Sequence, residues 1–170
     1  MAMELTRRGI LTGRRARPDF IAPPWAVARE DYIARCTGCG DCVSACPDGV
    51  IILRDGVAQM DFSNGGCDFC GDCADACGDG AISRLLRETQ GDRLPLHADM
   101  GSSCIAFNGI TCRLCEEACE VRAIRFVTTV GFKSVPLVDD QACTGCGFCQ
   151  AVCPVKAVDL RPVPVEEEMS

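Results

Sequence analysis

The chain has 170 residues, of which 48% are hydrophobic but only 5% aromatic, so a large side-chain core is not expected. Small domains of this kind depend on metals or cross-links for stability. The formal net charge is −7, with +3 in residues 1–20 and −10 in the remainder, which argues against nucleic-acid binding by the body of the chain. No apolar run approaches the roughly 18 residues that a membrane span needs.

Residues 1–30 are predicted to form a basic, extended leader. Arg7 and Arg8 look superficially like a twin-arginine export signal, but such a signal needs an apolar region of about 7–15 residues after the arginines. The charged stretch Gly13–Asp19 follows instead, so the sequence favours a cytoplasmic protein. We expect Trp25, the only tryptophan, to anchor this leader to the body or to a partner.

Sixteen cysteines occur as four groups of four, and three groups share the spacing C-x2-C-x2-C-x3-C. The groups are Cys36, Cys39, Cys42 and Cys46; Cys67, Cys70, Cys73 and Cys77; Cys104, Cys112, Cys115 and Cys119; Cys143, Cys146, Cys149 and Cys153. This run is the bacterial ferredoxin pattern for [4Fe–4S] ligation. The sequence therefore predicts four [4Fe–4S] clusters.

The fourth cysteine of each run ligates the other cluster in two-cluster ferredoxins. We therefore predict crossed sets, and the 21-residue step from Cys46 to Cys67 suits such a compact pair. The sets are Cys36, Cys39, Cys42 and Cys77; Cys67, Cys70, Cys73 and Cys46; Cys104, Cys112, Cys115 and Cys153; Cys143, Cys146, Cys149 and Cys119. The alternative is that each motif holds its own cluster.

The four motifs indicate an internal duplication. The offset from Cys39 to Cys112 is 73 residues and that from Cys67 to Cys143 is 76, whereas Cys36 to Cys104 is 68, so five residues are inserted after Cys104. Fixed-offset similarity is typical of two copies of one unit. The expected parts are a leader 1–30, dicluster units 31–90 and 91–165, and an acidic tail 166–170.

The predicted fold class is α+β: two tandem bacterial dicluster ferredoxin-like units with few short strands and helices. A short helix is expected after the third cysteine of each motif, and residues 84–100 are predicted to be a polar linker. Apolar runs that favour strands occupy residues 49–53, 57–62, 81–82, 123–127, 135–138 and 157–158.

Some of these residues also allow other interpretations. Zinc also binds Cys-x2-Cys pairs, usually as separated pairs, and disulfides are disfavoured in a reducing cytosol. His97 is the only histidine, and a structural or surface role is expected for it. Glu116, Glu117 and Glu120 form either a solvated helix face or a group that lowers the potential of the third cluster. No nucleophile–base pair or phosphate loop is visible, so the sequence does not predict an enzyme.

Two features go beyond a general polyferredoxin: the leader with Arg7–Gly13 and Pro23–Trp25, and the stretched third motif from Cys104 to Cys112. Both resemble the NapF family, the ferredoxin-type accessory proteins of periplasmic nitrate reductase systems. All sixteen cysteines match that arrangement, while Gly78 and Glu120 replace the proline that follows the fourth cysteine in ferredoxin runs.

The resemblance implies a cytoplasmic protein that associates with the precursor of the nitrate reductase catalytic subunit before export. It also implies a part in assembling or loading that subunit's own [4Fe–4S] cluster. Two other functions stay open at this point: a general low-potential electron-transfer ferredoxin that feeds a reductase, and a non-redox role in which the clusters only hold the fold.

Overall fold

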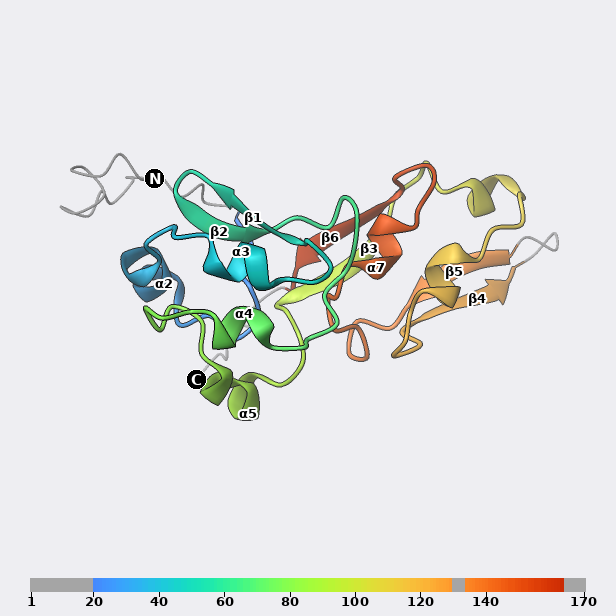
Figure 1. Cartoon of the computed structure of the whole chain (residues 1–170). Helices are drawn as coiled ribbons and strands as arrows, with labels where there is room; N and C mark the ends of the chain where they lie inside the picture. Colours follow the sequence, from blue (N-terminus) through green and yellow to red (C-terminus); the bar gives the residue numbers. More distant parts are fainter. Residues whose placement is uncertain (1–19, 130–133, 164–170) are drawn as a thin grey trace, which may run out of the picture. The chain divides into compact units, whose positions relative to one another are not determined.

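The computed structural model describes residues 20–129 and 134–163, and Figure 1 shows their helices and strands. The described chain divides into two compact units. Unit 1 holds the residues up to Asp61 together with Phe69–Gly91, and unit 2 holds Phe62–Asp68 together with the chain from Asp92 onward. Residues 62–68, which were expected in the first unit, therefore group with the second.

The contacts of residues 62–68 explain this grouping. The Cys67 N–H donates a hydrogen bond to the Cys146 carbonyl at 2.7 Å. The ring of Phe62 packs directly on the backbone at Gly147, where no side chain would fit. The segment that carries Cys67 is thus fixed to the loop of the fourth motif.

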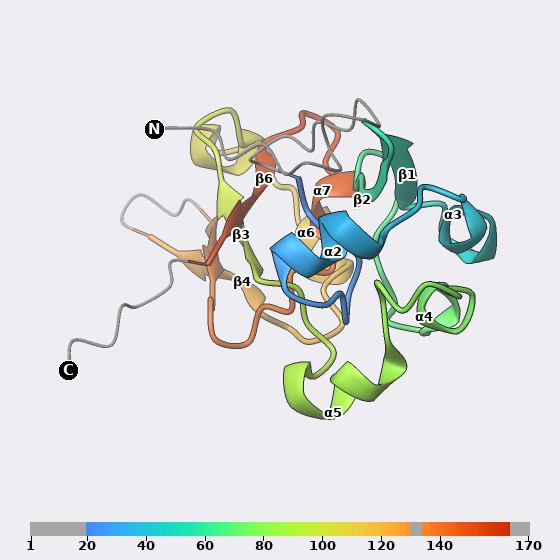
Figure 2. The same cartoon turned by 90° about the vertical axis from the view of Figure 1, so that its left-hand side faces the viewer.

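Unit 1 is built from short elements around a two-stranded hairpin. Asp55 and Gly56 both have positive φ, 54° and 79°, which is the backbone of a type I′ turn, and Asp-Gly is a preferred sequence for it. Helix α3 lies against both α4 and β1 (Figures 1 and 2). The elements are α2 Arg29–Arg35, α3 Asp41–Ala45, β1 Ile51–Arg54, β2 Val57–Met60, α4 Asp72–Asp75, η1 Arg84–Leu86 and α5 Arg87–Gln90.

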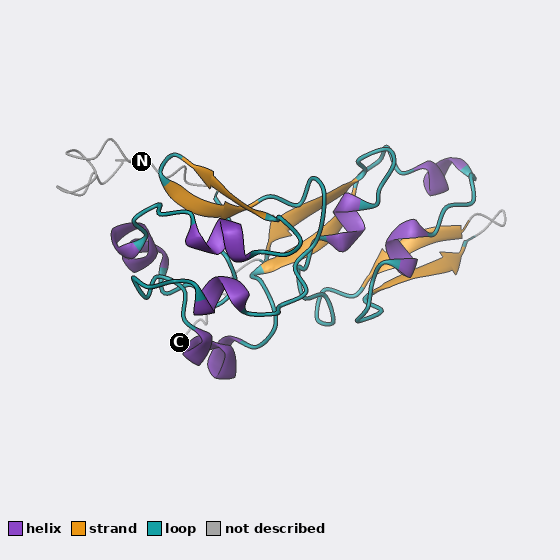
Figure 3. Cartoon of the chain, in the orientation of Figure 1, coloured by secondary structure: helices purple, strands orange, loops and turns teal. Residues whose placement is uncertain are grey.

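Unit 2 contains two antiparallel strand pairs, β4 with β5 and β3 with β6, each of five residue pairs (Figure 3). Its α6 contacts α7 and β4, and α7 contacts β6. The elements are β3 Leu96–Met100, η2 Ile105–Asn108, α6 Leu114–Glu117, β4 Ile124–Thr128, β5 Ser134–Val138, α7 Phe148–Ala151 and β6 Val158–Pro162.

The predicted duplication is visible in the pairing. The β1–β2 hairpin of unit 1 corresponds to β4–β5 of unit 2. In unit 2, β3 pairs with β6 so that Met100 faces Val158. The equivalent residue pair in unit 1 is the isolated bridge between Ala26 and Ile82. The strand expected at residues 81–82 is therefore a single bridge, and the end of the leader occupies the position that β3 has in unit 2.

Trp25 anchors the end of the leader to unit 1. Its side chain is 1% exposed, and its indole N–H donates to the Gly91 carbonyl at 2.9 Å. The ring of Phe69 lies 6.4 Å away, and the Arg87 guanidinium stands 5.1 Å from the indole centroid. Of the two anchoring points expected for Trp25, the structure places it on the body.

Several elements were not predicted. Helix α2 begins at Arg29, where an extended leader was expected to continue to residue 30. Residues 84–100 are not a simple linker, because they form η1, α5 and β3. In β3 the buried Leu96 and Ala98 alternate with the half-buried His97 and Asp99, which is the two-residue period of a strand with one face on the core.

Other expectations concern residues that lie outside the described ranges. Arg7 and Arg8 lie within residues 1–19, and the acidic tail 166–170 lies within residues 164–170; the structure describes neither segment. Among the described residues, no helix is long and apolar enough to cross a membrane.

Because Trp25 is buried and hydrogen bonded, Trp25→Ala should lower the free energy of unfolding by about 3 kcal/mol through cavity formation. The measurement is guanidinium unfolding of the cluster-loaded protein under anaerobic conditions, followed by far-UV circular dichroism. Leu85→Ala is the control, since Leu85 is 85% exposed and its truncation should leave the midpoint unchanged. Equal midpoints for both variants would contradict the anchor.

Candidate iron–sulfur centres

Four thiols of unit 1 line one hollow, which we call site 1. They are Cys36, Cys39, Cys42 and Cys77, and the hollow has a volume of about 340 Å³ including the space open to solvent. Three of these cysteines come from the first motif and the fourth from the end of the second motif. This is the first of the crossed sets that the sequence predicts, brought together in the structure.

Unit 2 holds two more hollows with the same construction and volumes of about 350 and 310 Å³. One hollow, site 3, is lined by three thiols of the third motif and by the last thiol of the fourth motif. The other, site 4, is lined by three thiols of the fourth motif and by the last thiol of the third motif. Site 3 is lined by Cys104, Cys112, Cys115 and Cys153. Site 4 is lined by Cys119, Cys143, Cys146 and Cys149.

The remaining predicted set, site 2, stays a prediction. It consists of Cys46, Cys67, Cys70 and Cys73. Of these, Cys67 belongs to unit 2 and the others to unit 1. Cys73 is buried within α4, and Cys46 directly follows α3.

The arrangement of the thiols fits a cubane cluster. All sixteen cysteines are free thiols. Within residues 20–129 and 134–163, no three cysteine, histidine, aspartate or glutamate side chains converge closely enough to hold one metal ion. A single zinc ion needs its sulfurs at about 2.3 Å from one point. Thiols set around a hollow instead match a cluster with one iron at each of four separate corners.

The loop backbones of sites 1 and 4 are built to face an anion. Gly38 and Gly145 have φ of 71°, and Gly40 and Gly147 have φ of 89°. A Cβ at Gly38 would lie 2.6 Å from the Gly56 carbonyl oxygen, so only glycine fits there. In the described structure the N–H groups of these four glycines donate to no acceptor. Successive N–H groups of this kind form an anion-binding nest, suited to a cluster with its four thiolates.

The second motif keeps this backbone geometry with one residue that is not glycine, and the third motif departs from it. In the second motif, Phe69 and Gly71 occupy the left-handed positions with φ of 58° and 93°. The third motif has a seven-residue segment between Cys104 and Cys112, and Arg113 stands at the position of the second glycine with φ of −133°. The third motif therefore lacks the left-handed pair found in the other three.

The 4Fe-4S dicluster domain family matches residues 25–82 and, separately, residues 109–157. Ferredoxin-type protein NapF of Escherichia coli K12 is 36% identical over 160 residues, which cover 93% of this chain and 95% of that protein. This chain belongs to the NapF family of ferredoxin-type proteins. Its two dicluster domains and sixteen cysteines account for four [4Fe–4S] clusters.

Two further relatives are similar to this chain over most of its length. Ferredoxin-type protein NapF of Haemophilus influenzae is 39% identical over 150 residues, covering 86% of this chain and 82% of that protein. The methylamine utilization ferredoxin-type protein MauM of Methylorubrum extorquens is 31% identical over 167 residues, covering 89% of this chain and 76% of that protein. The resemblance of this chain to the NapF family is thus confirmed.

Burial makes the bare thiols of this NapF-family chain reluctant to ionise. Burial, reinforced by neighbouring thiols, raises the pKa of Cys42 and of Cys115 to about 11 and that of Cys149 to about 12. Iron binds the thiolate, so cluster assembly must release these protons.

The sulfur atoms that end three motifs accept backbone hydrogen bonds. Ala123 N–H donates to Cys119 Sγ and Ala157 N–H to Cys153 Sγ, both at 3.2 Å. In unit 1, the Ile82 N–H donates to Cys77 Sγ at 3.4 Å. Such bonds stabilise negative charge on a ligand sulfur and orient it, which are levers on cluster potential.

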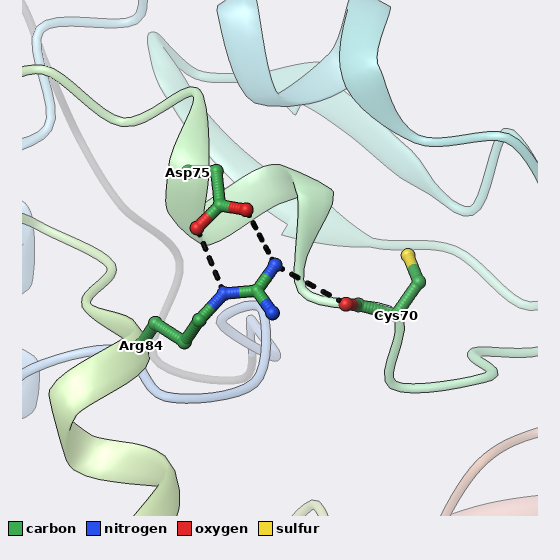
Figure 4. A network of polar contacts seen from close by, with 3 residues as sticks. All are labelled: Cys70, Asp75 and Arg84. Atoms are coloured by element: carbon green, nitrogen blue, oxygen red, sulfur yellow. Dashed lines mark hydrogen bonds and ion pairs between the residues drawn. The ribbon is translucent and has the colours of Figure 1, made fainter.

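An arginine braces the loop of the second motif (Figure 4). Arg84 donates from Nε to Asp75 Oδ1 at 2.8 Å and from Nη2 to the Cys70 carbonyl at 3.3 Å. Its guanidinium lies directly against the backbone of Gly71. Since both partners of the ion pair are largely exposed, its contribution to stability is small, about 1 kcal/mol or less. Its main effect is to fix the loop that carries Cys70.

Sequence reasoning identified every cysteine but missed two supporting residues. Tyr32 is fully buried, lines site 1, and donates its hydroxyl to the Ala58 carbonyl at 2.8 Å. It lies in α2 four residues before Cys36, which directly follows the helix and donates its backbone N–H to the Tyr32 carbonyl, and this spacing was the available signal. Arg84 gave no comparable signal, because its partners lie 9 and 14 residues away in sequence.

The crossed ligation can be tested with paired cysteine substitutions. In Cys104→Ala/Cys153→Ala both changes fall on site 3, so iron should drop from about sixteen to about twelve atoms per chain. The matched variant Cys104→Ala/Cys119→Ala affects sites 3 and 4 and should retain only about eight. Iron and acid-labile sulfide are counted after anaerobic purification. If each motif instead held its own cluster, Cys104→Ala/Cys153→Ala would retain about eight iron atoms and Cys104→Ala/Cys119→Ala about twelve.

Proposed function

We propose that this chain is a cytoplasmic accessory protein for the periplasmic nitrate reductase system. It binds the precursor of the catalytic subunit before export and assists its maturation by loading a [4Fe–4S] cluster or supplying electrons. Family membership carries the proposal, because NapF of Escherichia coli aligns over 93% of this chain and 95% of itself. The alignment spans both dicluster units rather than one ferredoxin domain.

The charge of the chain supports a docking role. Residues 21–170 carry a formal charge of −10, before any contribution from the clusters. A negative body of this kind is complementary to basic patches on a redox partner or a precursor polypeptide. Added salt weakens such an encounter, because it screens exposed charges.

The chemistry of the sites supports a carrier rather than an enzyme, so we propose no catalytic residues. The functional side chains are thiols. His97 is half-buried in β3, where it pairs with Arg161 of β6, so its position is structural.

One observation favours the alternative, a general low-potential electron-transfer ferredoxin. The nests at sites 1 and 4 would hold a cluster firmly, because their N–H groups suit its negative charge. Those two sites suit electron transfer without loss of iron.

Binding is tested by capture of the nitrate reductase precursor on immobilised, cluster-loaded protein at low and high salt. We expect the full chain to retain the precursor at low salt and to release most of it at about 0.5 M, where the screening length is only a few Å. Removal of residues 1–19 tests the basic leader. If neither form retains the precursor, the accessory function loses its basis.

Donation is separated from electron supply by following iron. The chain is loaded with ⁵⁷Fe and incubated anaerobically with precursor that lacks its cluster, and both proteins are re-isolated. Cluster loading predicts about four ⁵⁷Fe atoms on each activated precursor. Activation of a precursor that already holds its cluster, with all ⁵⁷Fe remaining on the donor, would instead support the electron carrier.

A further inference from the structure

We infer that the four sites are unequal, and that site 3 is the exchange site from which a cluster passes to thiolates of an acceptor polypeptide. Sites 1 and 4 retain their clusters. The inference rests on the proposed function and deepens it, because it assigns the transferable [4Fe–4S] cargo to Cys104, Cys112, Cys115 and Cys153.

The first argument is the backbone that faces the cluster. At sites 1 and 4, paired left-handed glycines leave N–H groups without protein acceptors, ready to face a cluster. In the third motif the N–H groups of Phe107, Gly109 and Ile110 donate instead to backbone carbonyls of their own turn, at 3.0–3.2 Å. These N–H groups are therefore occupied and do not contribute to an anion nest at site 3.

The second argument is the tether between ligands. In the other motifs two residues separate the first cysteine from the second, but seven separate Cys104 from Cys112. After one iron–sulfur bond breaks, a short tether returns the thiolate quickly because its effective concentration is high. A longer segment lowers that concentration, so an incoming thiolate competes better at Cys104 than at any other first cysteine.

The third argument is access to the sulfurs. Sites 1 and 4 each hold two buried thiols, Cys36 with Cys42 and Cys143 with Cys149. At site 3 only Cys115 is buried. Cys39 of site 1 is exposed, but it lies between the two left-handed glycines that form the nest of its loop. A single buried thiol and a missing nest occur together at site 3 alone among the three described hollows.

The fourth argument is charge. Glu116 and Glu117 directly follow Cys115 in α6, whereas Cys42 of site 1 has one acidic neighbour, Asp41, and Cys149 of site 4 has none. A cubane with four thiolates is itself negative, so nearby carboxylates weaken its retention. Arg113 pairs with Glu116 at 3.1 Å and offsets one of these two charges, which leaves that of Glu117.

Transfer is a ligand exchange without net redox change. Each acceptor thiol loses a proton and forms one iron–sulfur bond as the corresponding bond to Cys104, Cys112, Cys115 or Cys153 breaks. The leaving cysteinate takes up the proton. Over the whole exchange four bonds form, four break and four protons move, while the cluster core keeps its irons, sulfides and oxidation state.

The test uses the full-length, ⁵⁷Fe-loaded chain and cluster-free nitrate reductase precursor. After transfer, the donor is re-isolated anaerobically, treated with iodoacetamide, and digested for mass spectrometry. We expect transfer to stop near one cluster per chain, with about twelve iron atoms retained. Alkylation should fall on Cys104, Cys112, Cys115 and Cys153, at least tenfold above the other twelve cysteines.

The outcomes separate this inference from the proposed function. If iron reaches the precursor but alkylation falls on another set or on all cysteines evenly, site 3 is not the exchange site and the donor function stands. If no iron reaches the precursor, the donor function and the exchange site both fail. In a second variant, Cys104→Ala/Cys153→Ala, transfer should drop at least tenfold while capture of the precursor is kept; transfer at the original rate would also overturn the assignment.

Discussion

The packing of unit 2 depends on one constraint: the last thiol of each motif lies in the hollow of the other motif. Cys153 reaches site 3 and Cys119 reaches site 4, so α6 and α7 must stay together for either hollow to keep four thiols. The core built around them consists of Ala98, Cys115, Ala123, Ile124, Cys143, Cys149 and Val158. Three of these seven core residues are ligands. Cluster binding and core packing in unit 2 are therefore coupled, because both involve the same three cysteines.

The same constraint explains an unusual backbone feature that recurs in every motif. The third residue after each fourth cysteine has positive φ, and these residues are Gly49, Gly80, Arg122 and Lys156. For Arg122 and Lys156 this conformation costs about 1–2 kcal/mol. In both cases the next N–H donates to the sulfur that has just crossed, at 3.2 Å. The strained backbone at Arg122 and Lys156 thus occurs next to the N–H group that orients the sulfur of Cys119 or Cys153.

The sequence predicted the parts of the molecule that depend on cysteine spacing and on short apolar runs, including the four strands β1, β2, β4 and β5. It failed where a residue's role depends on tertiary contacts. The strand β3 was missed because its buried positions Leu96 and Ala98 alternate with His97 and Asp99, so the segment as a whole reads as polar. Helix α2 was missed because it is only seven residues long, although Glu30 and Asp31 in its first turn and Arg35 in its last turn are favourable helix signals. No local sequence pattern predicts that Arg84 contacts the loop at Cys70, because the two residues lie 14 positions apart.

The duplicated halves also differ in how much they rely on iron. Unit 1 has four residue pairs in its β1–β2 hairpin and a single bridge between Ala26 and Ile82. Unit 2 has five pairs in β4–β5 and five more in β3–β6. Backbone pairing that does not involve sulfur is therefore more extensive in unit 2. The departures from the nest geometry at site 3 occur in the half whose strands best maintain the fold when a ligand set is vacated. Loss of a cluster is better tolerated there, because neither strand pair contains a cysteine and their backbone hydrogen bonds do not involve iron.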